Sequence, residues 1–180
     1  MLSCTKPYFD GSSNGGAAQA GVTPVAMLAA PSFNDAFVQE GFALKGLFES
    51  GLVYNLAFVD PYEADTPGHA AMRATLGSFT DSASTFLVAG WSSQYHLKGV
   101  IEAALKGGDI TRAGIRRAAA NVNVESDGMM PTRALGQNRA DKESSIGKPD
   151  GSIASGVQLL SSRYVGETAK NHDWGAGPCS

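Results

Sequence analysis

The sequence predicts an α/β fold in which a small, mostly parallel sheet is followed by consecutive helices. Three short apolar runs near residues 1–5, 24–30 and 52–59 have the character of strands, and helix-like segments separate them. After residue 60, helical patterns follow one another with no strand between them. The later helices are therefore expected to pack beside the sheet rather than across its centre. A chain of 180 residues is long enough to bury a core of this kind.

The strand predictions rest on the composition of the apolar runs. Residues 25–30 read Val-Ala-Met-Leu-Ala-Ala, which is typical of a strand buried on both faces of a parallel sheet. Residues 52–59 are rich in branched and aromatic side chains, which favour strands. Between the strands, residues 10–21 predict a weak, glycine-rich helix and residues 36–48 predict a helix interrupted by glycines.

Three further helices are predicted over residues 66–76, 84–106 and 110–123. The first begins at Thr66-Pro67, where a hydroxyl stands at the cap position and proline at the first helical position. The second carries one apolar stripe at helical spacing, formed by Leu97, Val100, Ile101, Ala104 and Leu105. Asp109 caps the third after a Gly-Gly stop.

The helical pattern fades after Asp127-Gly128. Residues 132–152 are dominated by polar and charged residues and by glycine, which predicts a long loop or disorder. Residues 157–165 predict one more strand, and the last ten residues are expected to be a frayed tail.

Composition excludes several classes of function. A net charge of −3 argues against nucleic-acid binding, and Arg112 and Arg116 are expected to lie on a solvated helix face. No apolar run approaches the roughly 20 residues that span a bilayer, and no export signal is recognised after Met1. The two cysteines, Cys4 and Cys179, lie near opposite ends of the chain, and their spacing leaves open whether they pair.

No pattern of catalytic, metal-binding or cofactor-binding residues is recognised. Asp60, Glu63, Asp65 and His69 lie close together, but the ligand register of a metal loop is absent, and a solvated connector is the preferred interpretation. The glycine-rich segment 11–16 lacks the spacing of a phosphate-binding loop. The chain is therefore expected to be no enzyme and to need no metal or cofactor.

The order of features between Asp65 and Pro131 resembles the C-terminal part of solute-binding proteins that serve branched-chain amino acid (Leu/Ile/Val-type) ABC transporters. The segments that carry this resemblance are Asp65-Thr66-Pro67-Gly68-His69, Gly90-Trp91, Gly107-Gly108-Asp109-Ile110-Thr111-Arg112 and Asp127-Gly128-Met129-Met130-Pro131. The resemblance implies a partial type I periplasmic-binding-protein fold: a remnant of the second lobe's parallel sheet, plus helices that normally pack on the first lobe. It divides the chain into 1–59 (second lobe), 60–65 (connector), 66–123 (helices of the first lobe) and 124–180 (a loop-rich segment with one strand).

The resemblance also implies where a solute would bind. In open α/β sheets ligands lie at the carboxyl ends of the strands, and Tyr8 stands where an aromatic cleft residue is expected. Ser32 and Phe33 stand in the loop where some members of the family place a carboxylate that holds the ligand's ammonium group. The absence of an acid there weakens the case for an amino acid solute, and Asp10 or Asp35 would have to supply the charge instead.

By the same resemblance, the chain is expected to be the solute-binding component of an ABC importer for amino acids or similar small polar solutes. Its partners would be that solute and, in a full-length form, an ABC permease, and its location would be periplasmic or extracellular. The family is roughly twice as long, so the chain is expected to lack the first lobe's sheet and to look N-terminally truncated. The stripe from Leu97 to Leu105 would then be exposed and prone to self-association.

Two alternatives remain open at the level of sequence. One is a small α/β enzyme or ligand-sensing domain, which turnover abolished by a single polar substitution would favour. The other is a non-functional gene fragment, or a chain that works only beside a second polypeptide.

Overall fold

The computed structural model describes residues 2–3, 16–17, 19–22, 25–77, 83–135 and 142–172. Tyr8, the two cysteines and most of the helix predicted over residues 10–21 lie outside these residues. Within them, the main sheet has five strands in the order β1-β2-β3-β6-β7, and a second sheet pairs β4 with β5. The mixed α/β class predicted from the sequence is confirmed.

The first three strands form the predicted parallel part of the sheet. They are β1 (Leu2–Ser3), β2 (Ala26–Ala29) and β3 (Val53–Ala57). Strand β2 pairs in parallel with β1 on one side and with β3 on the other. The apolar runs therefore predicted both the strands and their direction.

The other half of the sheet is antiparallel, which the sequence did not predict. Strand β6 (Ser144–Pro149) pairs antiparallel with β3, and β7 (Val157–Tyr164) pairs antiparallel with β6. The predicted strand over 157–165 is thus confirmed, but the prediction of a loop over 132–152 is wrong for β6. The inward positions of β6 are Ser145, Gly147 and Pro149, so a buried strand here carries no apolar alternation.

A hydrophobic core covers one face of this sheet. It is formed by Ala26, Leu28, Phe33, Phe37, Val38, Phe48, Val53 and Val157. The continuous helix predicted over 36–48 is replaced by two short ones, the 3₁₀ helix η2 (Asp35–Val38) and α2 (Lys45–Phe48). Gly41 lies between them with φ of 86°, a conformation that ends a right-handed helix. We call the five strands of the main sheet, together with η2 and α2, the sheet group.

The three later helices are confirmed close to their predicted bounds: α3 (Pro67–Leu76), α4 (Thr85–Lys106) and α5 (Arg112–Asn121). In each helix the hydroxyl of the N-cap residue, Thr66, Ser84 or Thr111, accepts a hydrogen bond from a backbone N–H of the first turn. The prediction that Asp109 caps α5 is wrong, because Thr111 holds the cap position. Strands β4 (Asn123–Val124) and β5 (Arg133–Ala134) form a short antiparallel ribbon beside them. A final helix, α6 (Glu167–Asn171), follows β7.

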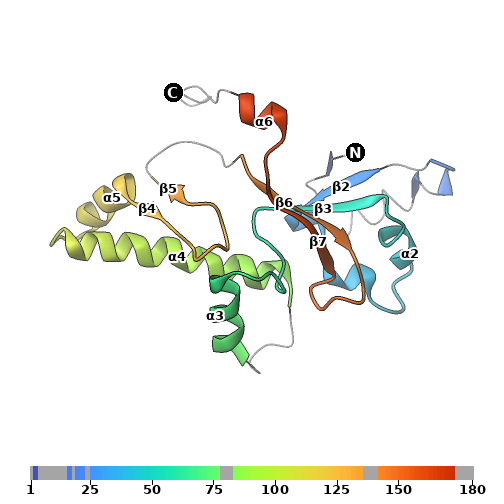
Figure 1. Cartoon of the computed structure of the whole chain (residues 1–180), viewed down its shortest axis with the longest axis horizontal. Coiled ribbons are helices and arrows are strands. Elements are labelled where there is room, and N and C mark those ends of the chain that lie inside the picture. The colour runs from blue at the N-terminus through green and yellow to red at the C-terminus, as the bar shows by residue number, and fades with distance from the viewer. Residues whose placement is uncertain are drawn as a thin grey trace.

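The helices pack beside the sheet, as predicted. Figure 1 shows α3, α4, α5 and the β4–β5 ribbon on one side of the molecule and the main sheet with α2 on the other. A second core joins Met72 of α3 and Val88 of α4 to three residues outside these helices. They are Val59, Met129 and Met130. We call α3, α4, α5, β4, β5 and the turn at residues 125–130 the helix group.

Candidate functional site

Ser32 and Phe33 follow β2 directly, at the edge of the sheet where the sequence predicted a solute. Ser32 belongs to the 3₁₀ helix η1 (Ala30–Ser32). Both side chains are buried, with 0% of Ser32 and 4% of Phe33 exposed. The ring of Phe33 meets that of Phe37 edge-on, with 6.2 Å between the ring centroids. In this conformation Phe33 supports the loop from inside the core, so solute contact by either residue stays a prediction, as does that by Tyr8.

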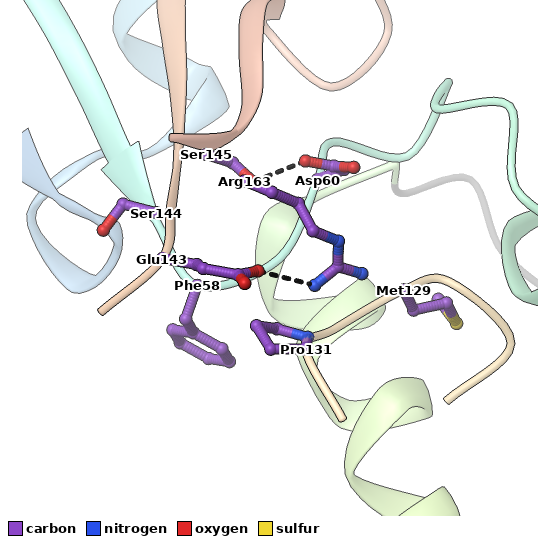
Figure 2. Close-up of a pocket in the computed structure, with 8 residues that line it drawn as sticks. All are labelled: Phe58, Asp60, Met129, Pro131, Glu143, Ser144, Ser145 and Arg163. Carbon is purple, nitrogen blue, oxygen red and sulfur yellow. Dashed lines mark hydrogen bonds and ion pairs between the residues drawn. The ribbon is translucent and has the colours of Figure 1, made fainter. Parts of the chain in front are cut away.

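The connector after β3 is anchored by a buried carboxylate. Asp60 is 4% exposed and accepts hydrogen bonds from the hydroxyls of Ser145 on β6 and Ser162 on β7, the latter at 2.7 Å. Figure 2 shows the first of these contacts. The interpretation of this segment as a solvated connector is therefore wrong for Asp60. Its partners lie 85 and 102 residues further along the chain, so no local pattern could reveal them.

His69 extends this polar network into the helix group. Its side chain is fully buried, with Nδ1 2.7 Å from the Thr66 hydroxyl and Nε2 3.3 Å from the backbone oxygen of Asp60. Because a carbonyl oxygen only accepts, the arrangement fits a neutral ring that donates from Nε2 to Asp60 and accepts at Nδ1 from Thr66. Burial lowers the pKa of His69, although the Asp60 carbonyl and charge oppose this in part. The ring is a structural group that joins α3 to the connector.

Glu63, the second of the three acidic residues that a metal site would have used, binds Ser155 instead. Its carboxylate accepts the Ser155 N–H at 2.9 Å and the Ser155 hydroxyl at 2.6 Å. These bonds hold the turn between β6 and β7. In the described part of the chain, no group of three or more His, Cys, Asp or Glu side chains is placed to hold a metal ion.

Arg163 on β7 faces the helix group across the connector. Its guanidinium donates to the backbone oxygen of Gly128 at 2.6 Å and to the Glu143 carboxylate at 3.4 Å. Figure 2 places the side chain between Glu143 and Met129, beside the Asp60–Ser145 contact. Arg163 has a φ of 53°, which is uncommon for a residue with a side chain.

The polar surface at this junction is hollowed. A groove of about 330 Å³ lies between the 125–132 turn and the side chains of Glu143 and Arg163. Phe58, which directly follows β3, is 47% exposed beside it and lines the smaller pocket of Figure 2. An exposed aromatic residue at the carboxyl end of a parallel strand is a reasonable contact for a ligand. Its position after β3 was the signal that could have identified it in the sequence.

None of the helices in the described part of the chain is long and apolar enough to cross a membrane. Four large apolar side chains of α4 are nevertheless exposed. Phe86, Leu97, Ile101 and Leu105 are 53%, 57%, 41% and 58% exposed. Val100 and Ala104 of the same predicted stripe are buried. The stripe is thus covered along one side only.

No protein-family model matches the sequence, and no curated protein does. Solved structures do match the fold. A fatty acid ABC transporter substrate-binding protein from Thermomonospora curvata matches with a TM-score of 0.79 and 19% identity, over 95% of this chain and 44% of that protein. The chain has part of a periplasmic-binding-protein fold.

Two further structures agree. An ABC transporter substrate-binding protein from Aeropyrum pernix matches with a TM-score of 0.66 and 14% identity, over 93% of this chain and 45% of that one. A branched-chain amino acid ABC transporter protein from Thermus thermophilus, with bound valine, matches with a TM-score of 0.57 and 10% identity, over 89% of this chain and 44% of that one. The chain spans less than half the length of each. All three are transport proteins by name, and none is described as an enzyme.

Proposed function

We propose that this chain supplies one part of the solute-binding component of an ABC importer and is not an enzyme. The observation that carries the proposal is the match of 95% of the chain, at a TM-score of 0.79, to a substrate-binding protein of that kind. In this proposal the protein acts outside the cytoplasm and delivers its solute to an ABC permease.

The proposal assigns the parts of the chain to two lobes. Residues 1–59 would belong to the second lobe, 60–65 to the connector, 66–123 to helices that pack on the first lobe, and 124–180 to the returning segment. The exposed stripe on α4 supports this division. An apolar helix face with Leu97 and Leu105 more than half exposed is what remains when a helix packs on a sheet contributed from elsewhere.

The proposed class of solute is supported by the residues at the carboxyl ends of the parallel strands and by the ligands named for two of the matched structures. We propose amino acids or similar small polar solutes, bound near Tyr8, Ser32 and Phe33. The fatty acid and valine named for two of the neighbours share a carboxylate attached to an aliphatic group. Exposed Phe58 would suit the aliphatic part, and no charged side chain stands at residues 31–33 to select an ammonium group.

A residue-resolved NMR titration of the 180-residue chain tests this proposal. The probes are valine, glutamine, acetamide and octanoate, each added up to about 10 mM, which detects binding free energies near −2.7 kcal/mol. We expect at least one carboxylate to shift the amide signals of Ser32, Phe33 and Phe58 more than those of α5, which lies on the far side of the helix group. Acetate and sodium chloride serve as controls for ionic strength. The absence of any saturable shift with all four probes would contradict solute binding.

A further inference from the structure

The end of β7 does not continue the regular ladder of the sheet. Ser144 pairs with Tyr164 and Ile146 pairs with Ser161, so that Ser145 alone on β6 stands opposite Ser162 and Arg163 on β7. One residue against two is a β-bulge, which interrupts the ladder and turns side chains away from their regular alternation. The bulge coincides with the positive φ of Arg163.

The two residues of the bulge point their polar groups to two different parts of the molecule. The Ser162 hydroxyl donates to the buried carboxylate of Asp60, at 2.7 Å, on the connector that leads out of the sheet. The guanidinium of Arg163 donates to the Gly128 carbonyl, at 2.6 Å, in the turn of the helix group. In a regular strand, neighbouring side chains would point to opposite faces. The bulge therefore ties β7 both to the connector and to the helix group.

The turn that receives Arg163 is fixed to helix α3. Asp127 and Gly128 have positive φ of 46° and 83°, which both residue types tolerate in turns. The Asp127 carbonyl accepts the Gly68 N–H of α3 at 2.9 Å. The hydrogen bond from Arg163 to Gly128 therefore joins β7 to a turn that is itself anchored to the helix group.

We propose that the bulge at Ser162–Arg163 is the joint that fixes the orientation of the sheet group relative to the helix group. Asp60 and Gly128 are its two attachment points. This role goes beyond the proposed function and holds whether or not the chain binds a solute. Where the two groups belong to opposite lobes, the joint sets how far a cleft between them opens.

Pulsed electron–electron distance measurements on the full chain test the joint. Nitroxide labels are attached to cysteines at Arg116, exposed on α5, and at Gln158, exposed on β7, after both native cysteines are replaced by serine. The labelled chain is expected to give one narrow distance distribution. Arg163→Gly keeps the positive φ without strain but removes the guanidinium, so the distribution should broaden and shift while the circular dichroism stays unchanged.

Two further variants complete the design. Ser162→Ala removes only the attachment to Asp60, and it should also broaden the distance distribution and shift its mean in the same direction as Arg163→Gly. Arg112→Ala removes an exposed arginine of α5 and should leave the distribution unchanged. A wild-type distribution in both Arg163→Gly and Ser162→Ala would overturn the proposal. Loss of the circular dichroism signal in Arg163→Gly would also overturn it, because the guanidinium would then be needed for folding and not for orientation alone.

Discussion

At the scale of single residues, the buried His69 contributes a pH dependence to the stability of the fold. Its folded pKa lies below the usual value of about 6.5, because burial of the ring disfavours the charged form more than the neighbouring Asp60 favours it. As the pH falls, the unfolded chain therefore binds a proton at His69 at a higher pH than the folded chain does. The contribution of His69 to stability is fully present above about pH 6.5, and it decreases as the pH falls through 6.5 towards the lower folded pKa.

We expect the wild-type free energy of unfolding to fall as the pH drops below about 6.5, with a smaller fall in His69→Gln. Urea denaturation at several pH values measures this. His172→Gln, at an exposed position near the end of the described chain, is the matched control and should keep the wild-type slope. Equal slopes in wild type and His69→Gln would show that the buried imidazole is not the titrating group.

Two glycines of neighbouring helices should respond oppositely to the same substitution. A Cβ on Gly68 of α3 would lie 3.0 Å from the Ser126 backbone oxygen and closer still to the Met129 side chain. Gly68→Ala should cost about 1–3 kcal/mol through overpacking. At Gly90 of α4 no described atom lies within 4 Å of a Cβ, so Gly90→Ala should stabilise by about 0.5–1 kcal/mol. Chemical denaturation compares the two, and a neutral Gly68→Ala would contradict the close packing of α3 on the 126–129 turn.

At the scale of elements, the apolar side of α4 is the feature that most needs a partner. Leu97, Ile101 and Leu105 leave an apolar surface in water that is larger than a scattered exposed leucine would produce. We expect the isolated chain to self-associate as its concentration rises, and Leu97→Lys to reduce this association. Analytical ultracentrifugation measures both.

Ala120→Lys adds the same charge at an exposed position of α5 and is the matched control. It should associate like the wild type if the stripe on α4 carries the contact. An equal reduction of association in both variants would show that the added charge alone lowers self-association. It would contradict a contact through the stripe on α4.

The elements also show what could be predicted from sequence and what could not. Strand β2 was predictable because its buried positions, Ala26 and Leu28, are apolar. Strand β3 was predictable because it is rich in branched and aromatic side chains, although Asn55 is buried within it. Helix α4 was predictable because its apolar residues recur at helical spacing. Strand β6 was not, because Gly147 is buried against Val157 in a position where a Cβ would clash, and Ser145 is buried for its bond to Asp60. The site shows the same limit: Asp60 has polar partners that only the folded sheet brings near it.

At the scale of the whole molecule, the sheet group and the helix group present two different kinds of surface. The sheet group offers one edge at which a solute would bind, and the helix group offers an apolar face that the described chain does not cover. The matched structures are more than twice as long as this chain. A site closed from two sides removes its solute from water, whereas a site with one side leaves it hydrated.

In the proposed function, this chain would carry only part of a solute site. Isothermal titration calorimetry of the monomeric 180-residue chain, with the carboxylate that gives the largest NMR shifts, tests it most directly. Two missing buried hydrogen bonds, at about 1 kcal/mol each, already weaken binding by more than tenfold. We expect the chain to bind with a dissociation constant of about 1 mM or weaker, near −4.1 kcal/mol. A dissociation constant of about 1 μM or tighter on a monomer would show that the site is complete within this chain and would contradict the account.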